Sequence, residues 1–501
     1  MKYKVYNKII KYFCGLAFLL ISSENLYAQS TTEKPNTILQ NAAESMMGFS
    51  KLQNSVFSFY VKDMSTGTVY ADLNGDMSIP SASTMKLVTT ATAFQLLGSA
   101  YHFKTKVMYS GNIDSMGTLH GDVYIIGGGD PTLGSKYFTK YGEERDFLYQ
   151  WADSLYNLGI RKIEGRVIAD GSLYNYDGIP SGWVWGDIGN YYGAGPAGLT
   201  IFDNLCIFHF KTGENEGDST ELTCITPHIP GIRVRNYVTS ANSSKDNAYV
   251  YGAPWSYDWF VRGSIPKQKE DFKVKASMPD PEMVAALEFD YALEQTGIDV
   301  MYASQTMREL KANEQYVQPE LKEILTHNSP YLSTIINVTN EQSINLFAEH
   351  ILCQISVERS GYGSTYNGAQ ICTNYWGDKI GASALNMTDG SGLSRSNSIS
   401  AKFFVDMLTY MSKSSNAERF KGSLAVAGKS GTMSGMCKGT TAVGRVYGKS
   451  GTMTRVKSYA GYVDSKSGKK LAYAMIINNY NCSNTQIRKY FENLMVKMST
   501  F

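Results

Sequence analysis

The chain has 501 residues, of which 43% are hydrophobic and 18% charged, a balance typical of folded globular proteins rather than of disordered chains. Its length is sufficient for two or three domains, each with a core of its own. The formal net charge of +2 excludes the strongly basic surface that nucleic-acid binding requires.

The first 28 residues have the pattern of an export signal. Lysines precede an apolar run from Tyr12 to Ile21, and a cleavage site after Ala28 follows. Because the run is short for a membrane span, we expect cleavage near Ala28 and an exported, periplasmic protein. An uncleaved anchor is the alternative, and peripheral association with the membrane stays open.

Six cysteines follow this segment at wide spacing, without a C-x-x-C pair. This spacing argues against a zinc site, and the six histidines form no pair at helical spacing, so we expect no metal and no cofactor. Disulfides are open after export, with Cys206 and Cys224 as the nearest pair, and free buried thiols are an equal alternative.

The two ends of the chain predict one shared domain. A helix is predicted at residues 37–49, and a hairpin at 55–61 and 68–70. A second hairpin is predicted at 458–463 and 470–477, followed by a last helix at 484–498. We expect these segments to share one α+β core, with the rest of the chain nested inside it.

The interior of the chain predicts two nested domains. Strands within 101–126, a helix at 144–158 and a strand near Val167 indicate an α/β domain, whereas later residues are rich in short strands and turns. The predicted borders are 29–99 and 298–501 for the outer domain, 100–203 and 267–297 for the α/β domain, and 204–266 for the β-rich domain.

Ser83 and Lys86 lie three residues apart at the start of a predicted helix whose C-cap is Gly98. Residues one turn apart share a helix face, so the hydroxyl and the amine would lie side by side, as a nucleophile and its base require. Because the same spacing arises by chance in most chains of this length, the other motifs decide its meaning.

A Ser-x-Asn motif, Ser343 to Asn345, opens another predicted helix. Ser343 is either the N-cap of that helix or a hydroxyl that points into the same cleft as Ser83 and relays a proton. In the second case the amide of Asn345 would point into the cleft as well.

The sequence Gly-Lys-Ser-Gly-Thr-Met occurs twice, at 428–433 and at 448–453. Neither copy is a phosphate-binding P-loop, because the glycine upstream of each is at the wrong spacing. We favour the second copy as functional, because it runs into the closing hairpin. An edge strand there can offer its backbone to an extended peptide, with Lys449 supplying a positive charge for a carboxylate.

Taken in order, Ser83 to Lys86, Ser343 to Asn345 and Lys449 to Gly451 match the motifs of penicillin-binding proteins and class A β-lactamases. With Asp389 to Arg395 and Gly127 to Leu133, the chain resembles the D-alanyl-D-alanine carboxypeptidase/endopeptidase family of low-molecular-mass class C penicillin-binding proteins. That family nests two extra domains between its first two motifs, which a β-lactamase lacks.

The resemblance implies an α+β fold: a penicillin-binding/β-lactamase-like transpeptidase domain, an antiparallel sheet with helices, with two smaller nested domains. It implies that Ser83 attacks a D-alanyl peptide bond, that Lys86 is the base, with a pKa lowered by partial burial and by Lys449, and that Ser343 passes the proton to the leaving amine. The implied substrate-binding residues are Asn345, Lys449, Ser450, Gly451 and Thr452, the last with its N–H beside that of Ser83 in an oxyanion hole.

Asp130, which precedes a proline, either makes a turn or binds the free amine of a diamino acid in the wall peptide. The expected partners are peptidoglycan stem peptides and crosslinks, with β-lactams as covalent inhibitors and without nucleic acid; the oligomeric state is open. The leading hypothesis is a serine D-Ala-D-Ala carboxypeptidase and endopeptidase. The alternatives are a transpeptidase, a β-lactamase, and a non-catalytic wall-binding or sensor protein.

Overall fold

The computed structural model describes residue 35 and residues 37–313 and 316–501. The expected export signal at 1–28 and its cleavage after Ala28 lie outside the described residues. Within the described part of the chain, no helix combines the length and the apolar character needed to cross a membrane.

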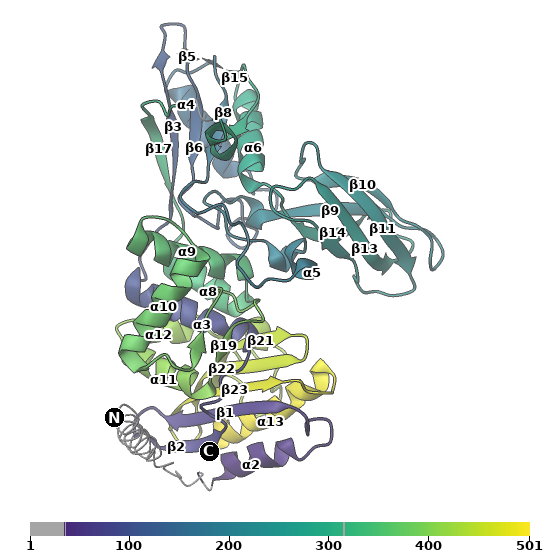
Figure 1. The fold of residues 1–501 in the computed structure, drawn as a ribbon, viewed down its shortest axis with the longest axis vertical. Helices are drawn as coiled ribbons and strands as arrows, with labels where there is room; N and C mark the ends of the chain where they lie inside the picture. Colours follow the sequence, from purple (N-terminus) through teal and green to yellow (C-terminus); the bar gives the residue numbers. More distant parts are fainter. Residues whose placement is uncertain (1–34, 36, 314–315) are drawn as a thin grey trace, which may run out of the picture.

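The outer domain is built on one antiparallel sheet of six strands, in the order β2-β1-β23-β22-β21-β20 (Figure 1). The two ends of the chain meet at its centre, where Phe59 of β1 lies opposite Met475 of β23. Both predicted hairpins are therefore confirmed, and they share one sheet. The strands are β1 (Val56–Asp63), β2 (Val69–Leu73), β20 (Ala425–Val426), β21 (Val446–Met453), β22 (Val456–Asp464) and β23 (Lys470–Asn478).

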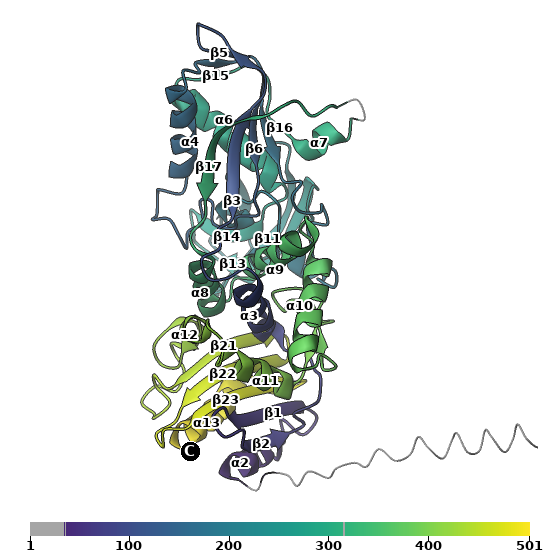
Figure 2. The same ribbon diagram turned by 90° about the vertical axis from the view of Figure 1, so that its left-hand side faces the viewer.

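Helices cover both faces of this sheet (Figure 2). The two predicted terminal helices, α2 (Ile38–Met47) and α13 (Asn484–Thr500), pack on one face. Strand β23 is buried on both faces, because successive side chains point to opposite sides of the sheet. Met475 packs among residues of α13, and Ile476 packs among residues of the helices on the opposite face. The α+β fold expected for this domain is confirmed.

The opposite layer surrounds α3 (Lys86–Leu96), whose residues from Lys86 to Phe94 are buried without interruption. The other elements of this layer are α8 (Leu332–Gln342), α9 (Asn345–Ser360), α10 (Thr365–Ile380), α11 (Ala401–Met411), α12 (Ala417–Gly422), β18 (Leu385–Asn386) and β19 (Ser398–Ile399). Helix α3 is buried on all sides because it packs against three other helices of this layer, α8, α9 and α10.

The nested α/β domain lies above the outer domain in Figure 1. A five-stranded sheet, β16-β8-β6-β3-β17, and a four-stranded sheet, β15-β7-β5-β4, pack with two long helices. Its elements are β3 (Lys104–Tyr109), β4 (Asn112–Ile113), β5 (Thr118–His120), β6 (Val123–Ile126), α4 (Asp146–Asn157), β7 (Lys162–Ile163), β8 (Val167–Asp170), α6 (Pro281–Gln295), β15 (Asp299–Val300), β16 (Gln305–Thr306), α7 (Met307–Lys311) and β17 (Lys322–Asn328).

The β-rich domain projects to the side in Figure 1 and consists of two three-stranded sheets, β10-β9-β14 and β11-β13-β12. Phe208 and Trp259, one from each sheet, lie in its buried core. Its strands are β9 (Leu205–Lys211), β10 (Glu221–Thr226), β11 (Arg233–Ala241), β12 (Tyr249–Tyr251), β13 (Asp258–Pro266) and β14 (Phe272–Ser277). Short helical turns, α5 (Trp185–Ile188), η2 (Tyr191–Gly193) and η3 (Phe202–Asn204), precede it.

Strand pairing differs from the predicted domain borders at two places. Strand β14 pairs with β9, so the β-rich sheets continue to Ser277 rather than ending at residue 266. Strand β17 pairs with β3, so residues 298–328, which we had assigned to the outer domain, belong to the sheets of the α/β domain. Both differences arise because a strand completes a sheet begun tens to hundreds of residues earlier.

Candidate active site

Ser83 lies in a short 3-10 turn, η1 (Ala82–Met85), that leads directly into α3. The predicted geometry is present, because the Nζ of Lys86 donates to the Oγ of Ser83 at 3.1 Å. At the other end of the helix, Gly98 takes the left-handed conformation (φ +84°) and its N–H donates to Ala93, as expected of a residue that ends a helix.

The side chain of Lys86 is fully buried and its Nζ has two further partners, the Oδ1 of Asn345 at 2.6 Å and the carbonyl oxygen of Ser391 at 2.7 Å. Both of these oxygens only accept. In its charged form Lys86 donates to both oxygens and to Ser83. After it loses a proton, the neutral amine keeps two N–H donors for the two oxygens, and its lone pair can accept the hydroxyl proton of Ser83.

Burial lowers the pKa of Lys86 to about 7, although the carboxyls of Glu349 and Asp389 oppose the shift. Burial is complete rather than partial, and it is the dominant cause. Burial, with the charges of Lys86 and Lys457, also lowers the pKa of Lys449 well below its usual range. Lys86 can therefore be unprotonated at neutral pH, as a general base must be.

The pH dependence of the reaction follows from this lowered pKa. Only the neutral form of Lys86 can accept a proton, so kcat/KM should rise as the pH rises through about 7 and then level off. The measurement is kcat/KM between about pH 5.5 and pH 9 for the D-alanine release that the resemblance implies. A profile without a rising limb in that interval would contradict the assignment of Lys86 as the base.

Ser343 lies between two helices and does not cap the second one, so the N-cap alternative is wrong. It ends α8 in the left-handed conformation (φ +64°), and Ile344 precedes the first residue of α9 without a side-chain cap. The Oγ of Ser343 accepts a hydrogen bond from the Nζ of Lys449 at 2.7 Å. A non-glycine residue in this conformation is strained, and here the sharp turn directs a hydroxyl toward the site.

Asn345 begins α9, and both ends of its side-chain amide are used. Its Oδ1 accepts from Lys86, and its Nδ2 donates to the carbonyl oxygen of Tyr192 at 2.8 Å. The Nδ2 carries two hydrogens, so one N–H remains for a substrate.

Lys449 to Met453 form an open stretch of strand edge. The short strand β20 pairs with β21 only at Tyr447 and Gly448, and none of the other described strands pairs with that side of β21. Gly451 is required there, because a Cβ would lie 2.4 Å from the carbonyl oxygen of Ser81. The absence of a side chain thus lets β21 approach the turn that carries Ser83.

The two copies of Gly-Lys-Ser-Gly-Thr-Met have different positions. The second lies on β21, whereas the first contributes the turn η4 (Gly431–Met433) and an exposed Lys429. The first copy still reaches the site, because the Oγ of Ser450 donates to the Oγ1 of Thr432 at 2.9 Å. The sequence did not predict this supporting contact between the repeats.

These motifs surround a cavity of about 470 Å³. Ser83, Ser343, Asn345 and Thr452 line it directly, while Lys86 and Lys449 reach it through their hydrogen bonds to the two serines. The nested domains supply part of the wall. Their contributions are Lys136, Tyr137, Asp187, Tyr191, Tyr192, Asp203 and Leu205.

Asp130 is not part of this wall. It is buried, and its Oδ1 accepts from the N–H of Thr132 at 2.8 Å and from the hydroxyl of Thr132 at 2.6 Å. Burial raises the pKa of Asp130 to about 6. The turn alternative is present in the structure, and the buried carboxyl of Asp130 is not among the residues that line the cavity. Asp187 and Asp203 are the aspartates that line it.

Two buried carboxyls fix the loop beside Lys86: Asp389, the first residue of the motif at 389–395, and Glu349, which the sequence did not single out. Glu349 accepts from the N–H groups of Gly390 and Ser391, at 2.9 and 2.8 Å. Asp389 accepts from the N–H of Gly392 at 2.7 Å and from the indole of Trp183 at 2.8 Å. These bonds hold the carbonyl of Ser391 against Lys86. The sequence signal that could have identified Glu349 is its position four residues after Asn345, which places both side chains on the same face of α9.

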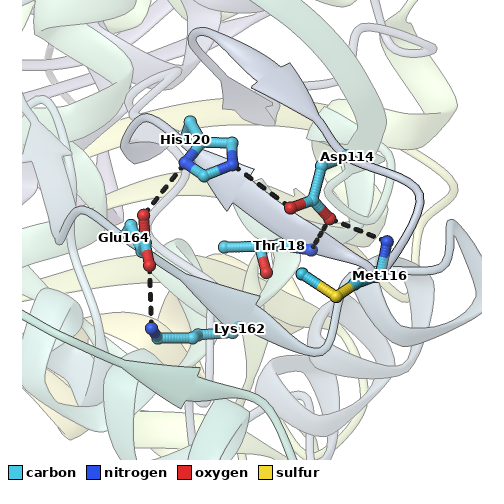
Figure 3. Close-up of polar contacts among 6 residues, drawn as sticks. All are labelled: Asp114, Met116, Thr118, His120, Lys162 and Glu164. Atoms are coloured by element: carbon cyan, nitrogen blue, oxygen red, sulfur yellow. Dashed lines mark hydrogen bonds and ion pairs between the residues drawn. The ribbon is translucent and has the colours of Figure 1, made fainter.

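The histidines and cysteines contribute nothing to the cavity, since none of the described ones lines it. His120 lies far from it, between Asp114 and Glu164 on the α/β domain, where Glu164 also pairs with Lys162 (Figure 3). Among the described residues, no group of histidine, cysteine and acidic side chains could hold a metal ion. All six described cysteines are free thiols, so Cys206 and Cys224 are not joined.

Comparison with known proteins gives one family across nearly the whole chain. The model of the D-Ala-D-Ala carboxypeptidase 3 (S13) family matches residues 39–500. The chain is 27% identical over 465 residues to a D-alanyl-D-alanine carboxypeptidase of Actinomadura sp. (strain R39), covering 89% of this chain and 82% of that one. It is 24% identical over 434 residues to D-alanyl-D-alanine carboxypeptidase DacB of Haemophilus influenzae, covering 86% of each.

The fold is also similar to a solved structure. Penicillin-binding protein 4 (dacB) from Haemophilus influenzae superposes with a TM-score of 0.77 at 23% sequence identity, over 92% of this chain and 100% of that one. This likeness supports the arrangement of a penicillin-binding domain with nested domains.

Proposed function

The chain belongs to the D-Ala-D-Ala carboxypeptidase 3 (S13) family, and from this premise we propose that it is a serine D-Ala-D-Ala carboxypeptidase and DD-endopeptidase acting on peptidoglycan peptides. The observation that carries the proposal is the hydrogen bond between Ser83 and the buried Lys86 at the wall of the cavity. It pairs a nucleophile with a base whose pKa suits neutral pH.

The reaction begins with transfer of the Ser83 hydroxyl proton to Lys86. The Oγ of Ser83 then bonds to the carbonyl carbon of the penultimate D-alanine, and the N–H groups of Ser83 and Thr452 stabilise the resulting oxyanion. The C–N bond breaks as Ser343 donates its hydroxyl proton to the leaving amine and takes up the proton that Lys86 removed from Ser83. Lys449, 2.7 Å from the Oγ of Ser343, holds that hydroxyl in position. Water then attacks the ester on Ser83 and gives a proton to Lys86, which passes it to the Oγ of Ser83 as the ester bond breaks.

Substrate binding uses the open edge of β21. An extended peptide can pair with β21 along the stretch from Lys449 to Met453 that β20 leaves unpaired, and its terminal carboxylate can bind Lys449 and the hydroxyl of Ser450. Burial and the neighbouring lysines lower the pKa of Lys449, and a carboxylate bound beside it would raise that pKa again. Lys449 thus becomes charged when the anion to be bound is present.

The repeated motif offers a matched pair of variants for this role. Lys449→Met should lower kcat/KM for a peptide with a free C-terminus about 10- to 100-fold, the value of one charge-assisted bond. Lys429→Met removes the equivalent but exposed lysine and should change kcat/KM less than threefold, as is usual for surface sites.

A substrate with an amidated C-terminus provides the specific readout. It lacks the carboxylate, so the wild type should already be slow and Lys449→Met should add little further loss. An equal defect of Lys449→Met on both substrates would show that Lys449 acts on something other than the carboxylate.

Two assays separate the proposed activity from its alternatives. D-alanine release from a pentapeptide tests the carboxypeptidase, and conversion of a crosslinked muropeptide dimer into monomers tests the endopeptidase. A protein that performs neither reaction would be a wall-binding or sensor protein. Slow covalent labelling of Ser83 by a β-lactam is expected, whereas rapid hydrolysis of the drug would indicate a β-lactamase. Joining of two stem peptides in place of hydrolysis would indicate a transpeptidase.

We propose that the protein acts after export, in the periplasm. The support is the lysine-rich, apolar pattern of residues 1–28. N-terminal sequencing of the protein isolated from cells should begin at Gln29; retention of the apolar run would indicate an anchor.

A further inference from the structure

The outward face of the sheet β11-β13-β12 exposes aromatic side chains. Residues alternate along each strand, so Val238, Trp259 and Val250 point into the buried core while their neighbours point to solvent. We define the aromatic face as the outward residues Tyr237, Tyr249, Tyr251, Phe260 and Arg262, together with Trp185 of α5. These strands are described throughout, and they turn no leucine, isoleucine, valine or methionine toward solvent.

The aromatic face is ordered by strand register. Arg262 on the central strand lies opposite Tyr237 on one side and Tyr249 on the other. The rings of Tyr251 and Phe260 stack at 4.7 Å, and Trp185 extends the row, with its ring 6.3 Å from that of Tyr251. The contacts of neighbouring rings hold the row in place, so a ligand can bind it with little loss of side-chain freedom.

Much of this aromatic area is in water. Tyr237 is 56% exposed, Tyr249 49% and Trp185 51%. The outward face of the other sheet in the same domain differs, because it carries Lys211, Lys273 and Lys275 around Ile207. The guanidinium of Arg262 lies 5.6 Å from the ring centre of Tyr237 and 5.1 Å from that of Phe260. Exposed tyrosine, tryptophan and arginine together are typical of binding surfaces.

The aromatic face is connected to the cavity through fixed contacts. The side chain of Asn190 bonds to both backbone groups of Val250, the residue between Tyr249 and Tyr251, at 3.1 and 3.3 Å. Two residues later, the carbonyl oxygen of Tyr192 accepts from Asn345. Helix α5 carries Trp185, which belongs to the aromatic face. Two residues later it carries Asp187, which lines the cavity. One short segment thus joins the two surfaces.

We propose that the aromatic face binds the sugar chain of peptidoglycan while its attached peptide occupies the cavity. Pyranose rings present flat C–H faces that stack on aromatic rings, with hydroxyls at the edges for tyrosine and arginine. The absence of aliphatic side chains favours this ligand over a protein surface, which would need apolar groups to bury. Arg262 and the nearby exposed Arg235 suit the carboxylates of peptides borne by neighbouring sugars. The choice of sugar chain rests on the proposed function, whose peptide substrate is tethered to it.

The test is retention of the full-length protein on immobilised, peptide-free glycan chains, released from cell walls by amidase treatment and coupled to a resin. The wild type should be retained, and Tyr237→Ala combined with Tyr249→Ala should weaken retention at least about tenfold. Tyr291→Ala combined with Tyr366→Ala, two comparably exposed tyrosines elsewhere, should change it less than twofold. Arg262→Gln, a milder change, should also weaken retention. All variants should release D-alanine from a small soluble peptide at the wild-type rate, which also shows that they are folded.

Two outcomes would overturn the inference: no retention of the wild type, or equal retention of the wild type and the tyrosine variants. The proposed function fails separately. Retention without D-alanine release from any peptide would refute the peptidase activity but not the binding of glycan. D-alanine release without retention would refute the binding of glycan but not the peptidase activity.

Discussion

Ser83→Ala is expected to abolish D-alanine release, lowering kcat/KM by about 10⁴-fold or more, because among the described hydroxyls that line the cavity only that of Ser83 is bonded to Lys86. Ser343 is the only other serine among the cavity-lining residues, and its Oγ is bonded to Lys449 instead of to Lys86. The fold should persist, since the substitution removes one oxygen from a partly exposed position. The measurement is peptide hydrolysis alongside thermal unfolding.

Ser244→Ala, in an exposed loop of the β-rich domain, is the matched control for Ser83→Ala and should keep full activity. Residual turnover by Ser83→Ala above about 1% of the wild type would mean that water is activated directly, without an acyl-enzyme.

Lys86→Met should have the second largest effect, a loss of about 10³- to 10⁴-fold in kcat/KM with Ser83 still present. Methionine has nearly the shape of lysine but cannot accept the hydroxyl proton. Reaction with a β-lactam should slow in parallel, because acylation of Ser83 by drug and by peptide needs the same base. Normal acylation in Lys86→Met would assign the base elsewhere.

Stability provides an independent readout for Lys86→Met. The pKa of Lys86 is about 7 in the folded protein and near 10.5 in the unfolded chain, so the unfolded state binds more protons between these values. Lys86 therefore destabilises the wild type increasingly as the pH falls from about 10 to about 7. Unfolding free energies of Lys86→Met should lack this dependence, and the difference from the wild type should shrink toward high pH.

The sequence predicted those features that depend on residues close together in the chain. The spacing of Ser83 and Lys86 predicted their contact, because residues about one helical turn apart lie on the same face. Both hairpins were readable from strand-forming residues and turn chemistry, as was the terminal helix that begins after Ser483. The choice of Lys449 over Lys429 rested on a similar local feature, the continuity of its motif with the closing hairpin.

Non-local contacts explain what the sequence did not predict. The border at residue 298 was misplaced because β17 completes a sheet begun at β3, and no local pattern shows such pairing. Asp130 looked available for a ligand, yet tertiary packing buries it. The left-handed turn at Ser343 follows from the junction of two helices rather than from any preference of serine.

Mass spectrometry of the β-lactam-treated protein shows directly which residue forms the acyl-enzyme. After proteolysis, we expect one modified peptide, containing Ser83, with the added mass of the intact drug, and none from Ser83→Ala. An adduct on any other residue, or D-alanine release that continues when Ser83 is fully modified, would contradict this expectation.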